Sequence, residues 1–343
     1  MTVHDSIARS KVFSMIRIDT PARAGILGNP SDGFFGKTIA APVRNFHACV
    51  ILFEWDRIEI LPGPTDRVNF DSPEELLEDF KINGYYGGFR LVKAAIKQFF
   101  DHVQENKISI PKKNFTIRYT SNIPRQVGLA GSSAIITSTI KALSHFYSVD
   151  IPKPIMANRV LWSETKELDI SAGLQDRVVQ VYDQPVFMDF EQSFMQQKGF
   201  GRYQPIDATI FPPMYLAYQA NLTHKDTIHN DVRKRFECGD LDITNTMDQI
   251  GKNALDGLNA LKNGDLEGFK NCIDKNFDLR ASIYPIAEKN KLMIEKARAI
   301  GATAKFPGSG GAIIGTYDDD SMFNALLKEF GKIGCEVVKI QMN

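Results

Sequence analysis

A segment rich in glycine and serine lies between a predicted strand and a predicted helix, an order that suits phosphate binding. It runs Ile123-Pro-Arg-Gln-Val-Gly-Leu-Ala-Gly-Ser-Ser-Ala134. Gly128 and Gly131 permit a positive φ and close approach of an anion. The first N–H groups of the following helix have no partners within it and attract negative charge. Ser132 and Ser133 add hydroxyls, one suited to cap the helix and the other to bind Mg²⁺. The pattern predicts a phosphate-binding loop over Gly128–Ala134, with a purely structural serine cap as the alternative.

Two better-known phosphate motifs are excluded. Gly36-Lys37-Thr38 looks like the end of a Walker A loop, but that motif requires glycine five positions before Gly36, where the chain has Ser31. No GxGxxG follows a strand, so the dinucleotide-binding pattern is missing as well. A phosphate-binding loop at 128–134 would therefore belong to neither class.

The elements around the loop are predicted from hydrophobic periodicity. Strands are expected at 50–53, 57–61 and 115–120, and helices over 88–103, from about 133, and over 152–168. A stretch near 190–212 is rich in Gln, Gly and Pro, and we place a domain boundary there, dividing the chain into 1–200 and 201–343.

The second part mixes strands with longer helices. The pattern predicts a strand at 214–218, helices over about 240–262, 265–280 and 286–300, a glycine-rich turn at 307–311, a short strand, a helix over 319–331 and a last strand near 336–340. Such runs favour an α+β fold over regular βα alternation.

Composition excludes several classes of protein. The 343 residues suit about two domains, and 41 Lys+Arg balance 41 Asp+Glu, so the net charge gives no support for a nucleic-acid partner. No apolar run approaches membrane-spanning length and the N-terminus lacks a signal-peptide core, so we expect no membrane partner and a cytoplasmic location.

The four cysteines lack a CxxC pair and are expected to be reduced, buried thiols. His224 and His229 lack a third ligand for a metal.

Three segments together resemble motifs of the GHMP kinase superfamily. Pro21-Ala-Arg-Ala-Gly-Ile-Leu-Gly-Asn-Pro-Ser-Asp32 is similar to its N-terminal substrate motif, Pro124–Ala134 to its phosphate loop, and Lys305-Phe-Pro-Gly-Ser-Gly-Gly-Ala312 to its C-terminal glycine motif. The three follow in the family's order over nearly the whole chain. The resemblance implies an α+β, two-domain GHMP kinase fold, with an N-terminal domain like ribosomal protein S5 domain 2 and a ferredoxin-like C-terminal domain.

Details of these motifs resemble the plant-type glucuronokinases. The phosphate loop has one residue more than the usual G-L-G-S-S-A, since Ala130 and Gly131 both precede Ser132. The first motif carries Asn29-Pro30 where many relatives carry Glu-His, and the segment 168–190 is also similar. This resemblance implies ATP-dependent phosphorylation of the anomeric hydroxyl of a sugar acid. D-glucuronate is the substrate that it favours.

The resemblance also implies roles for single residues. Ser133 and Glu164 would hold Mg²⁺, and the rest of the loop (Pro124, Gly128, Leu129, Ala130, Gly131, Ser132 and Ala134) would bind ATP. Asp176, 12 positions after Glu164, would be the catalytic base or orient the hydroxyl, with Arg23 neutralising charge beside it. A structural reading of Glu164 as a solvated helix carboxylate stays open.

The substrate side is less closely specified by the motifs. Asp32 would bind sugar hydroxyls, Asn29 replaces the family's glutamate, and Gly308, Ser309, Gly310 and Gly311 would bring the C-terminal part close to the substrate. A uronic acid also needs a cation for its carboxylate. Lys37 and Arg125 are the nearest basic candidates, although a surface position for Lys37 and a phosphate contact for Arg125 are the alternatives.

Two other functions remain open at this stage. The same motifs would serve a kinase for galacturonate, galactose, a heptose or a mevalonate-like alcohol, because specificity lies in loops that the motifs do not include. A catalytically inactive, ligand-sensing relative is the alternative from another class. Retention of Arg23, Ser133, Glu164 and Asp176 argues against it.

Overall fold

A long antiparallel hairpin forms the centre of the first sheet. The computed structural model describes residues 15–63, 66, 70–83, 87–219 and 231–343. Strand β1 (Ile16–Leu27) pairs with β2 (Lys37–Trp55) almost along its whole length. The other edge of β2 pairs with β5 (Val186–Asp189) near its start and with β4 (Asn114–Ser121) near its end. Strands β3 (Glu59–Leu61) and β6 (Arg202–Pro205) lie at the outer ends of this sheet.

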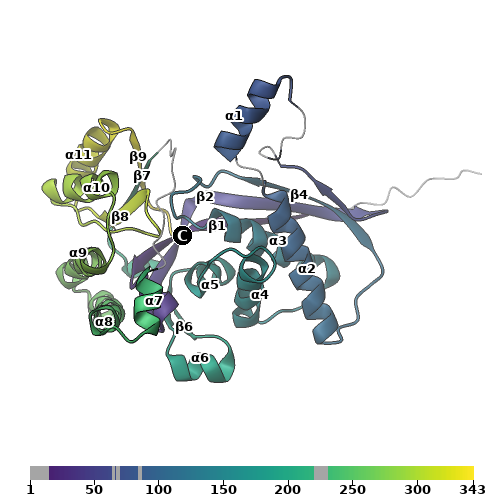
Figure 1. The fold of residues 1–343 in the computed structure, drawn as a ribbon, viewed down its shortest axis with the longest axis horizontal. Helices are drawn as coiled ribbons and strands as arrows, with labels where there is room; N and C mark the ends of the chain where they lie inside the picture. The colour runs from purple at the N-terminus through teal and green to yellow at the C-terminus, as the bar shows by residue number, and fades with distance from the viewer. Residues whose placement is uncertain (1–14, 64–65, 67–69, 84–86, 220–230) are drawn as a thin grey trace, which may run out of the picture.

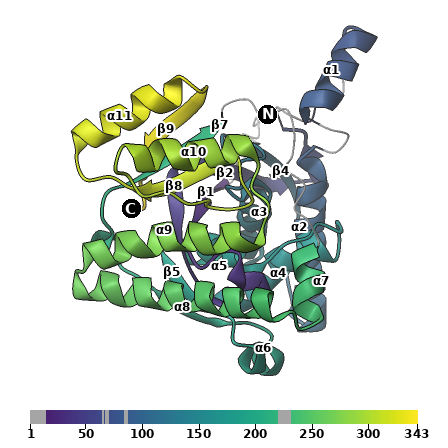
Figure 2. The ribbon, with the colours of Figure 1, turned by 60° about the vertical axis from the view of Figure 1, so that its left-hand side comes forward.

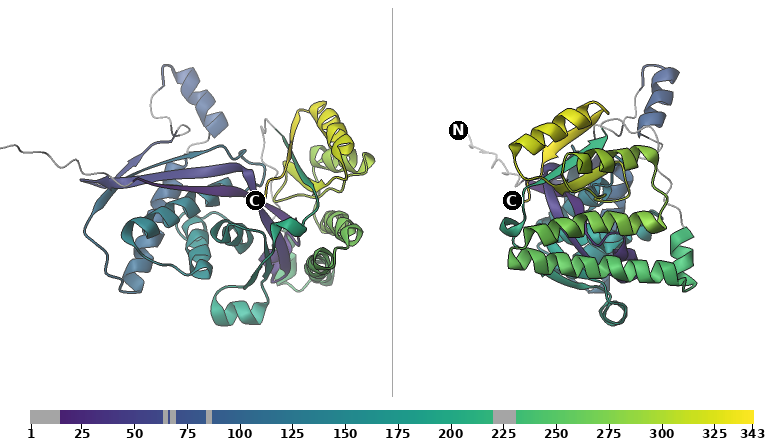
Figure 3. Two further views of the ribbon diagram at one scale, coloured as in Figure 1. Left: turned by 180° about the vertical axis from the view of Figure 1, so that it is seen from behind. Right: turned by 90° about the vertical axis from the view of Figure 1, so that its left-hand side faces the viewer.

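Four helices cover one face of this sheet (Figures 1 and 3). They are α2 (Phe89–Glu105), α3 (Gly131–Tyr147), α4 (Lys153–Thr165) and α5 (Leu174–Tyr182). Helix α3 packs against both β1 and β2, and its residues 133–140 are all buried. Helix α1 (Pro73–Asn83) stands apart from this layer in Figure 1, and α6 (Gln192–Lys198) connects β5 with β6. The buried position of α3 fixes where its N-terminus lies.

The second sheet is antiparallel, with β7 (Met214–Gln219) between β8 (Ala312–Thr316) and β9 (Cys335–Lys339). An extended segment borders β8, where Lys305 N donates to Ile314 O at 2.9 Å. Helices α10 (Glu288–Ala299) and α11 (Asp320–Gly331) pack with this sheet around a core of their own. Helices α8 (Leu241–Asn263) and α9 (Leu266–Ile283) run side by side and contact β1 (Figure 2). Helix α7 (Asp231–Glu237) precedes them.

The predicted α+β mixture is confirmed, and most predicted elements occur within a few residues of their expected ends. The strand expected at 50–53 is part of the much longer β2, which begins at Lys37. The elements that were not predicted are β1, β5, β6, α1, α5, α6 and α7. The first sheet includes β6, which lies beyond residue 200. We therefore propose that the division between the two parts falls after Pro205 rather than at 200.

Further expectations concern the membrane and the thiols. Within the described ranges, no helix combines the length and the apolar character needed to cross a membrane. All four cysteines are free. Cys49 and Cys335 are buried as expected, but Cys272 is only partly buried and Cys238 is exposed, so the expectation of buried thiols is wrong for these two. His224 and His229 lie outside the described residues.

Candidate active site

The predicted phosphate loop leads directly into helix α3. Helix α3 begins at Gly131, two residues earlier than expected, and its N-cap is Ala130, which has no side-chain capping bond. The expected serine cap is therefore wrong: Ser133 lies in the first turn, and its Oγ donates to Ala130 O at 3.1 Å. The left-handed residues are Gly128 (φ 73°) and Ala130 (φ 60°), not Gly131. The loop still presents the unpaired N–H groups of a helix N-terminus, which suit an anion.

The three motif segments meet at this loop. Arg23 N donates to Leu129 O at 3.1 Å, and Gly25 N donates to Pro307 O at 2.9 Å. A Cβ at Gly308 would lie 2.3 Å from Gly128 O. Only glycine allows so close an approach of two backbones. The phosphate loop is thus held between β1 of the first part and the glycine turn of the second.

Asp176 lies in the first turn of α5, beside this junction. Its Oδ1 is 2.5 Å from Nη2 of Arg23, and its Oδ2 is 3.0 Å from Nη1 of Arg177. Burial alone would raise the pKa of Asp176, but the two guanidinium groups outweigh it and hold the pKa below the ordinary value. Asp176 is therefore ionised at neutral pH and is in contact with Arg23, as the motifs implied.

Glu164 is buried on α4 and does not face solvent, contrary to the structural reading left open above. Arg177 donates to its Oε2 from Nε at 2.8 Å and also from Nη2. Burial would lower the pKa of Arg177, but Glu164 and Asp176 hold it above the ordinary value. Arg177 thus joins the two carboxylates. The sequence reasoning missed this residue, although it directly follows Asp176.

The oxygen donors fit a magnesium ion with few protein ligands. Both hydrogen bonds that Glu164 accepts from Arg177 end on Oε2, which leaves Oε1 for a further ligand. The hydroxyl of Ser133, buried at the phosphate loop, is a second hard donor. Mg²⁺ commonly takes one or two protein oxygens and completes its shell with water and phosphate. A larger metal cluster, of three or more His, Cys, Asp or Glu side chains, does not occur in the described part of the chain.

Asp32 lies in the short 3-10 helix η1 (Ser31–Phe34). A Cβ at Gly173 would lie 2.7 Å from its Oδ2, which brings η1 against the start of α5. Burial and the neighbouring charge of Asp176 raise the pKa of Asp32 to about 6, although Arg23 partly offsets them. Asp32 has no ion-pair partner among the described residues. Its carboxylate is therefore available to hydroxyl groups of a ligand.

Asn29 is buried and joins the two parts of the chain. Its Nδ2 donates to Phe306 O at 3.1 Å, and its Oδ1 accepts from Nζ of Lys305. Lys305 also donates to Gly25 O at 2.8 Å. Both ends of the Asn29 amide are thus occupied, so the structure gives Asn29 a role in domain contact rather than a free group for substrate.

The two basic residues expected to bind a carboxylate lie on β2 and just ahead of the phosphate loop. Lys37 lies on β2 with its Nζ 3.4 Å from Oδ1 of Asp189. Arg125 is exposed at the outer side of the phosphate loop. A different cation, Arg280 on α9, donates to Gly308 O at 2.7 Å. No local pattern in the sequence singled it out.

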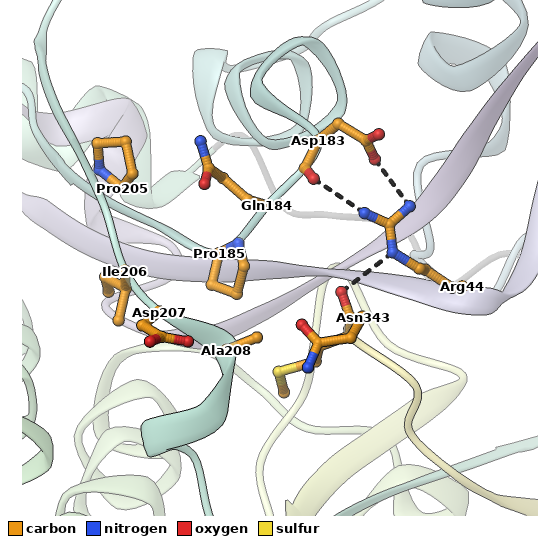
Figure 4. Close-up of a pocket in the computed structure, with 10 residues that line it drawn as sticks. Arg44, Asp183, Gln184, Pro185, Pro205, Ile206, Asp207, Ala208 and Asn343 are labelled. Carbon is orange, nitrogen blue, oxygen red and sulfur yellow. Dashed lines mark hydrogen bonds and ion pairs between the residues drawn. The ribbon is translucent and has the colours of Figure 1, made fainter.

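A cavity of about 420 Å³ lies away from these residues (Figure 4). It is lined by the α5–β5 connection, the segment 205–208 and the C-terminus. Arg44 crosses it, donating to Asp183 and to Met342 O. No residue of the three motifs lines this cavity, so it gives no support for a second catalytic centre.

Comparisons with known proteins agree with the motifs. Residues 90–184 match the family model for the GHMP kinases N terminal domain. The chain is 44% identical over 300 residues to "Probable glucuronokinase 2" of Arabidopsis thaliana, covering 85% of this chain and 82% of that protein. It is 42% identical to "Glucuronokinase 1" of the same plant, with the same coverage.

Solved structures share the fold at low sequence identity. Mevalonate kinase of Methanococcus jannaschii matches with a TM-score of 0.72 at 21% identity, over 96% of this chain and 99% of that one. Galactokinase of Lactococcus lactis, complexed with galactose, matches with a TM-score of 0.75 at 12% identity, over 96% and 94%. The predicted GHMP kinase fold is therefore confirmed.

Proposed function

The chain belongs to the GHMP kinases, and we propose that it transfers the γ-phosphoryl group of ATP to the anomeric hydroxyl of D-glucuronate, giving glucuronate 1-phosphate and ADP. The observation that carries this proposal is the contact of Arg23 with Asp176 beside the phosphate loop, in a chain 44% identical to a probable glucuronokinase. Phosphoryl transfer depends mainly on positioning and charge neutralisation, and these residues supply both.

ATP enters with its phosphates against Gly128–Ala134 and the N-terminus of α3. Backbone N–H groups there bind phosphate oxygens, and the helix dipole favours their charge. Ser133 and Glu164 would hold Mg²⁺, which would supply positive charge to the phosphates. Arg23, tied to Pro307 O at 2.5 Å, remains beside the transferred group and balances its negative charge.

Asp176 accepts the hydrogen bond of the anomeric hydroxyl. A carboxylate held ionised by two arginines is a weak base, so it orients the hydroxyl first and takes the proton late. As the sugar oxygen bonds to the γ-phosphorus, the bond between that phosphorus and the β–γ bridging oxygen breaks, and ADP leaves. Asp32 accepts hydrogen bonds from other hydroxyls of the sugar.

An ATP-consumption screen with Mg²⁺ tests this function. The purified protein is given D-glucuronate, galacturonate, galactose, a heptose or mevalonate, and product is identified by mass. We expect turnover with glucuronate above all. Turnover of neutral sugars alone would refute the proposal. ATP binding without turnover of any acceptor would favour a ligand sensor instead.

A cytoplasmic location and the lack of a nucleic-acid partner are also part of this proposal. The net charge of zero supports the lack of a nucleic-acid partner. Cell fractionation tests the first, and a nucleic-acid retention assay at low salt tests the second.

A further inference from the structure

Arg280 is a half-buried cation near the end of α9, next to the glycine turn of the third motif. Its Nη1 donates to Gly308 O at 2.7 Å, and its Nη2 donates weakly to Ser309 O at 3.5 Å. The guanidinium lies 5.1 Å from the ring centre of Phe306 and 5.7 Å from that of Tyr284. Its Nε is buried and has no hydrogen-bond partner in the described chain. A buried N–H without a partner is costly, so it points to a ligand that is not part of the chain.

The charge of Arg280 is not neutralised by a carboxylate. Within the described residues it has no ion pair, whereas Arg23 and Arg177 both contact Asp176. Burial lowers the pKa of Arg280 to about 10, so the side chain is still charged at neutral pH. Nε of Arg23 is also buried without a hydrogen-bond partner, but of the arginines in this region Arg280 is the one that has no ion pair with a carboxylate among the described residues.

Asp32 lies close enough to Arg280 for each charge to influence the other, yet the two are not in contact. The carboxylate of Asp32 acts on the pKa of both Arg280 and Tyr284, and Tyr284 is four residues further along the chain. Asp32 is packed against Gly173, and Arg280 donates to Gly308, which adjoins Gly128. One charge from each part of the protein therefore lies in the region where the two parts meet. Such a region suits a ligand that carries both hydroxyls and an acid.

Other cations near this region are already engaged. Lys305 donates to Gly25 O and to Asn29, and burial, together with the charges of Arg280 and Arg23, lowers its pKa well below the ordinary value. A lysine that is readily deprotonated is a poor anchor for a carboxylate. Arg280 keeps its charge and presents a planar fork, the geometry that carboxylates prefer.

We infer that Arg280 binds the carboxylate of the acid substrate through its free N–H groups, while Asp32 accepts hydrogen bonds from the sugar hydroxyls. This inference rests on the proposed function and adds the residue that selects an acid over a neutral sugar. In a uronic acid the reacting C1 and the carbon that bears the carboxylate flank the ring oxygen. A cation on the second part and a base on the first can therefore hold the two ends of one ring.

The test compares two substrates of nearly equal shape, D-glucuronate and the neutral D-glucuronamide. We expect Arg280→Gln to lower kcat/KM for glucuronate about 100-fold and to change kcat/KM for the amide less than about threefold. Arg280→Lys keeps the charge without the fork and should lose about tenfold for the acid. Arg233→Gln is the matched control, because Arg233 also donates to a backbone carbonyl beside Asp32, that of Gly33, but is exposed.

The outcomes separate the inference from the function on which it rests. Equal losses for acid and amide in Arg280→Gln would mean a structural role for Arg280 and overturn the inference, as would an unchanged preference for the acid. A selective loss in Arg233→Gln would move the role to that residue. Thermal melting shows whether Arg280→Gln folds. If it does not, Arg280→Lys decides: an unchanged preference of that variant for the acid would overturn the inference. Wild-type protein that does not phosphorylate glucuronate refutes the proposed function itself.

Discussion

Nη2 of Arg23, on β1, lies 2.5 Å from Oδ1 of Asp176, on α5. The two residues are 153 positions apart in the numbering of the chain, and Arg23 also donates to Pro307 O of the second part at 2.5 Å. This single arginine therefore ties the candidate base to both halves of the protein. Its position makes the charge state of Asp176 a property of the assembled fold rather than of α5 alone.

Replacing the candidate base tests its role directly. Asp176→Asn keeps the shape but removes the proton acceptor, so we expect ATP binding to persist and turnover to fall about 10²- to 10⁴-fold. Calorimetric titration with ATP and a coupled ADP assay measure the two effects. Asp169→Asn is the control, because Asp169 is exposed and its φ of 53° is one that asparagine tolerates. Rates near wild type in Asp176→Asn would remove Asp176 from the mechanism.

The buried pair of Glu164 and Arg177 makes a second prediction. Glu164→Gln leaves the charge of Arg177 poorly compensated, so we expect the free energy of unfolding to fall by about 3 kcal/mol. We also expect the Mg²⁺ concentration for half-maximal rate to rise by about tenfold or more. Urea unfolding and a Mg²⁺ titration at fixed ATP measure these changes.

The control for that prediction is Glu191→Gln. Glu191 also pairs with an arginine, Arg202, but both side chains are about half exposed. Exposed pairs contribute little, so we expect a much smaller loss of stability than in Glu164→Gln and no change in the Mg²⁺ requirement. Equal effects of the two substitutions would contradict the role given to Glu164.

Much of the fold was predictable because its signals are local. The break between α8 and α9 follows from Gly264, which ends one helix at a φ of 69°, and Asp265, whose side chain caps the next. Strand β1 was not predicted, because Pro21 and Gly25 interrupt its pattern and its pairing with β2 defines it. Long-range pairing of this kind has no local signature.

The site divides in the same way. The loop at 128–134, Asp32 and Asp176 stand in motifs that can be read along the chain. The functions inferred for Arg177 and Arg280 depend on contacts with residues 13 and 28 positions away. Asn29 shows the opposite. Its motif predicts a contact with the substrate, but its side-chain amide is hydrogen-bonded to Lys305 and to Phe306 O.

A glycine substitution tests the contact between the two parts. Gly308→Ala would place a Cβ 2.3 Å from Gly128 O, and both groups are backbone, which cannot turn away. We expect the phosphate loop to be displaced and the KM for ATP to rise about tenfold or more, because small misplacements of a binding loop are costly. The control, Gly331→Ala, adds a Cβ with no atom within 4 Å and should leave the KM unchanged. An unchanged KM in Gly308→Ala would show that the contact does not support nucleotide binding.

Asp32 predicts a conflict between stability and function. Its folded pKa of about 6 exceeds the ordinary 3.8, so the fold disfavours the ionised form. The stabilising contribution of the protonated group is complete below about pH 4 and is lost as pH rises through about 6. Asp32→Asn removes this penalty but also removes the acceptor for sugar hydroxyls. We therefore expect a more stable protein at pH 8 that binds sugar poorly.

The two pH regimes make this prediction specific. At pH 8, Asp32→Asn should raise the free energy of unfolding by about 2 kcal/mol. The full difference in pKa would give roughly 3 kcal/mol. The expected gain is smaller because Asp32 is partly exposed. At pH 4 the gain should vanish, since Asp32 is then largely protonated in the folded wild type. Urea unfolding at pH 4 and pH 8 measures the change in the free energy of unfolding. The exposed control, Asp169→Asn, should show no difference between the two pH values. A gain that is the same at pH 4 and pH 8 would mean that the charge of Asp32 is not its cause.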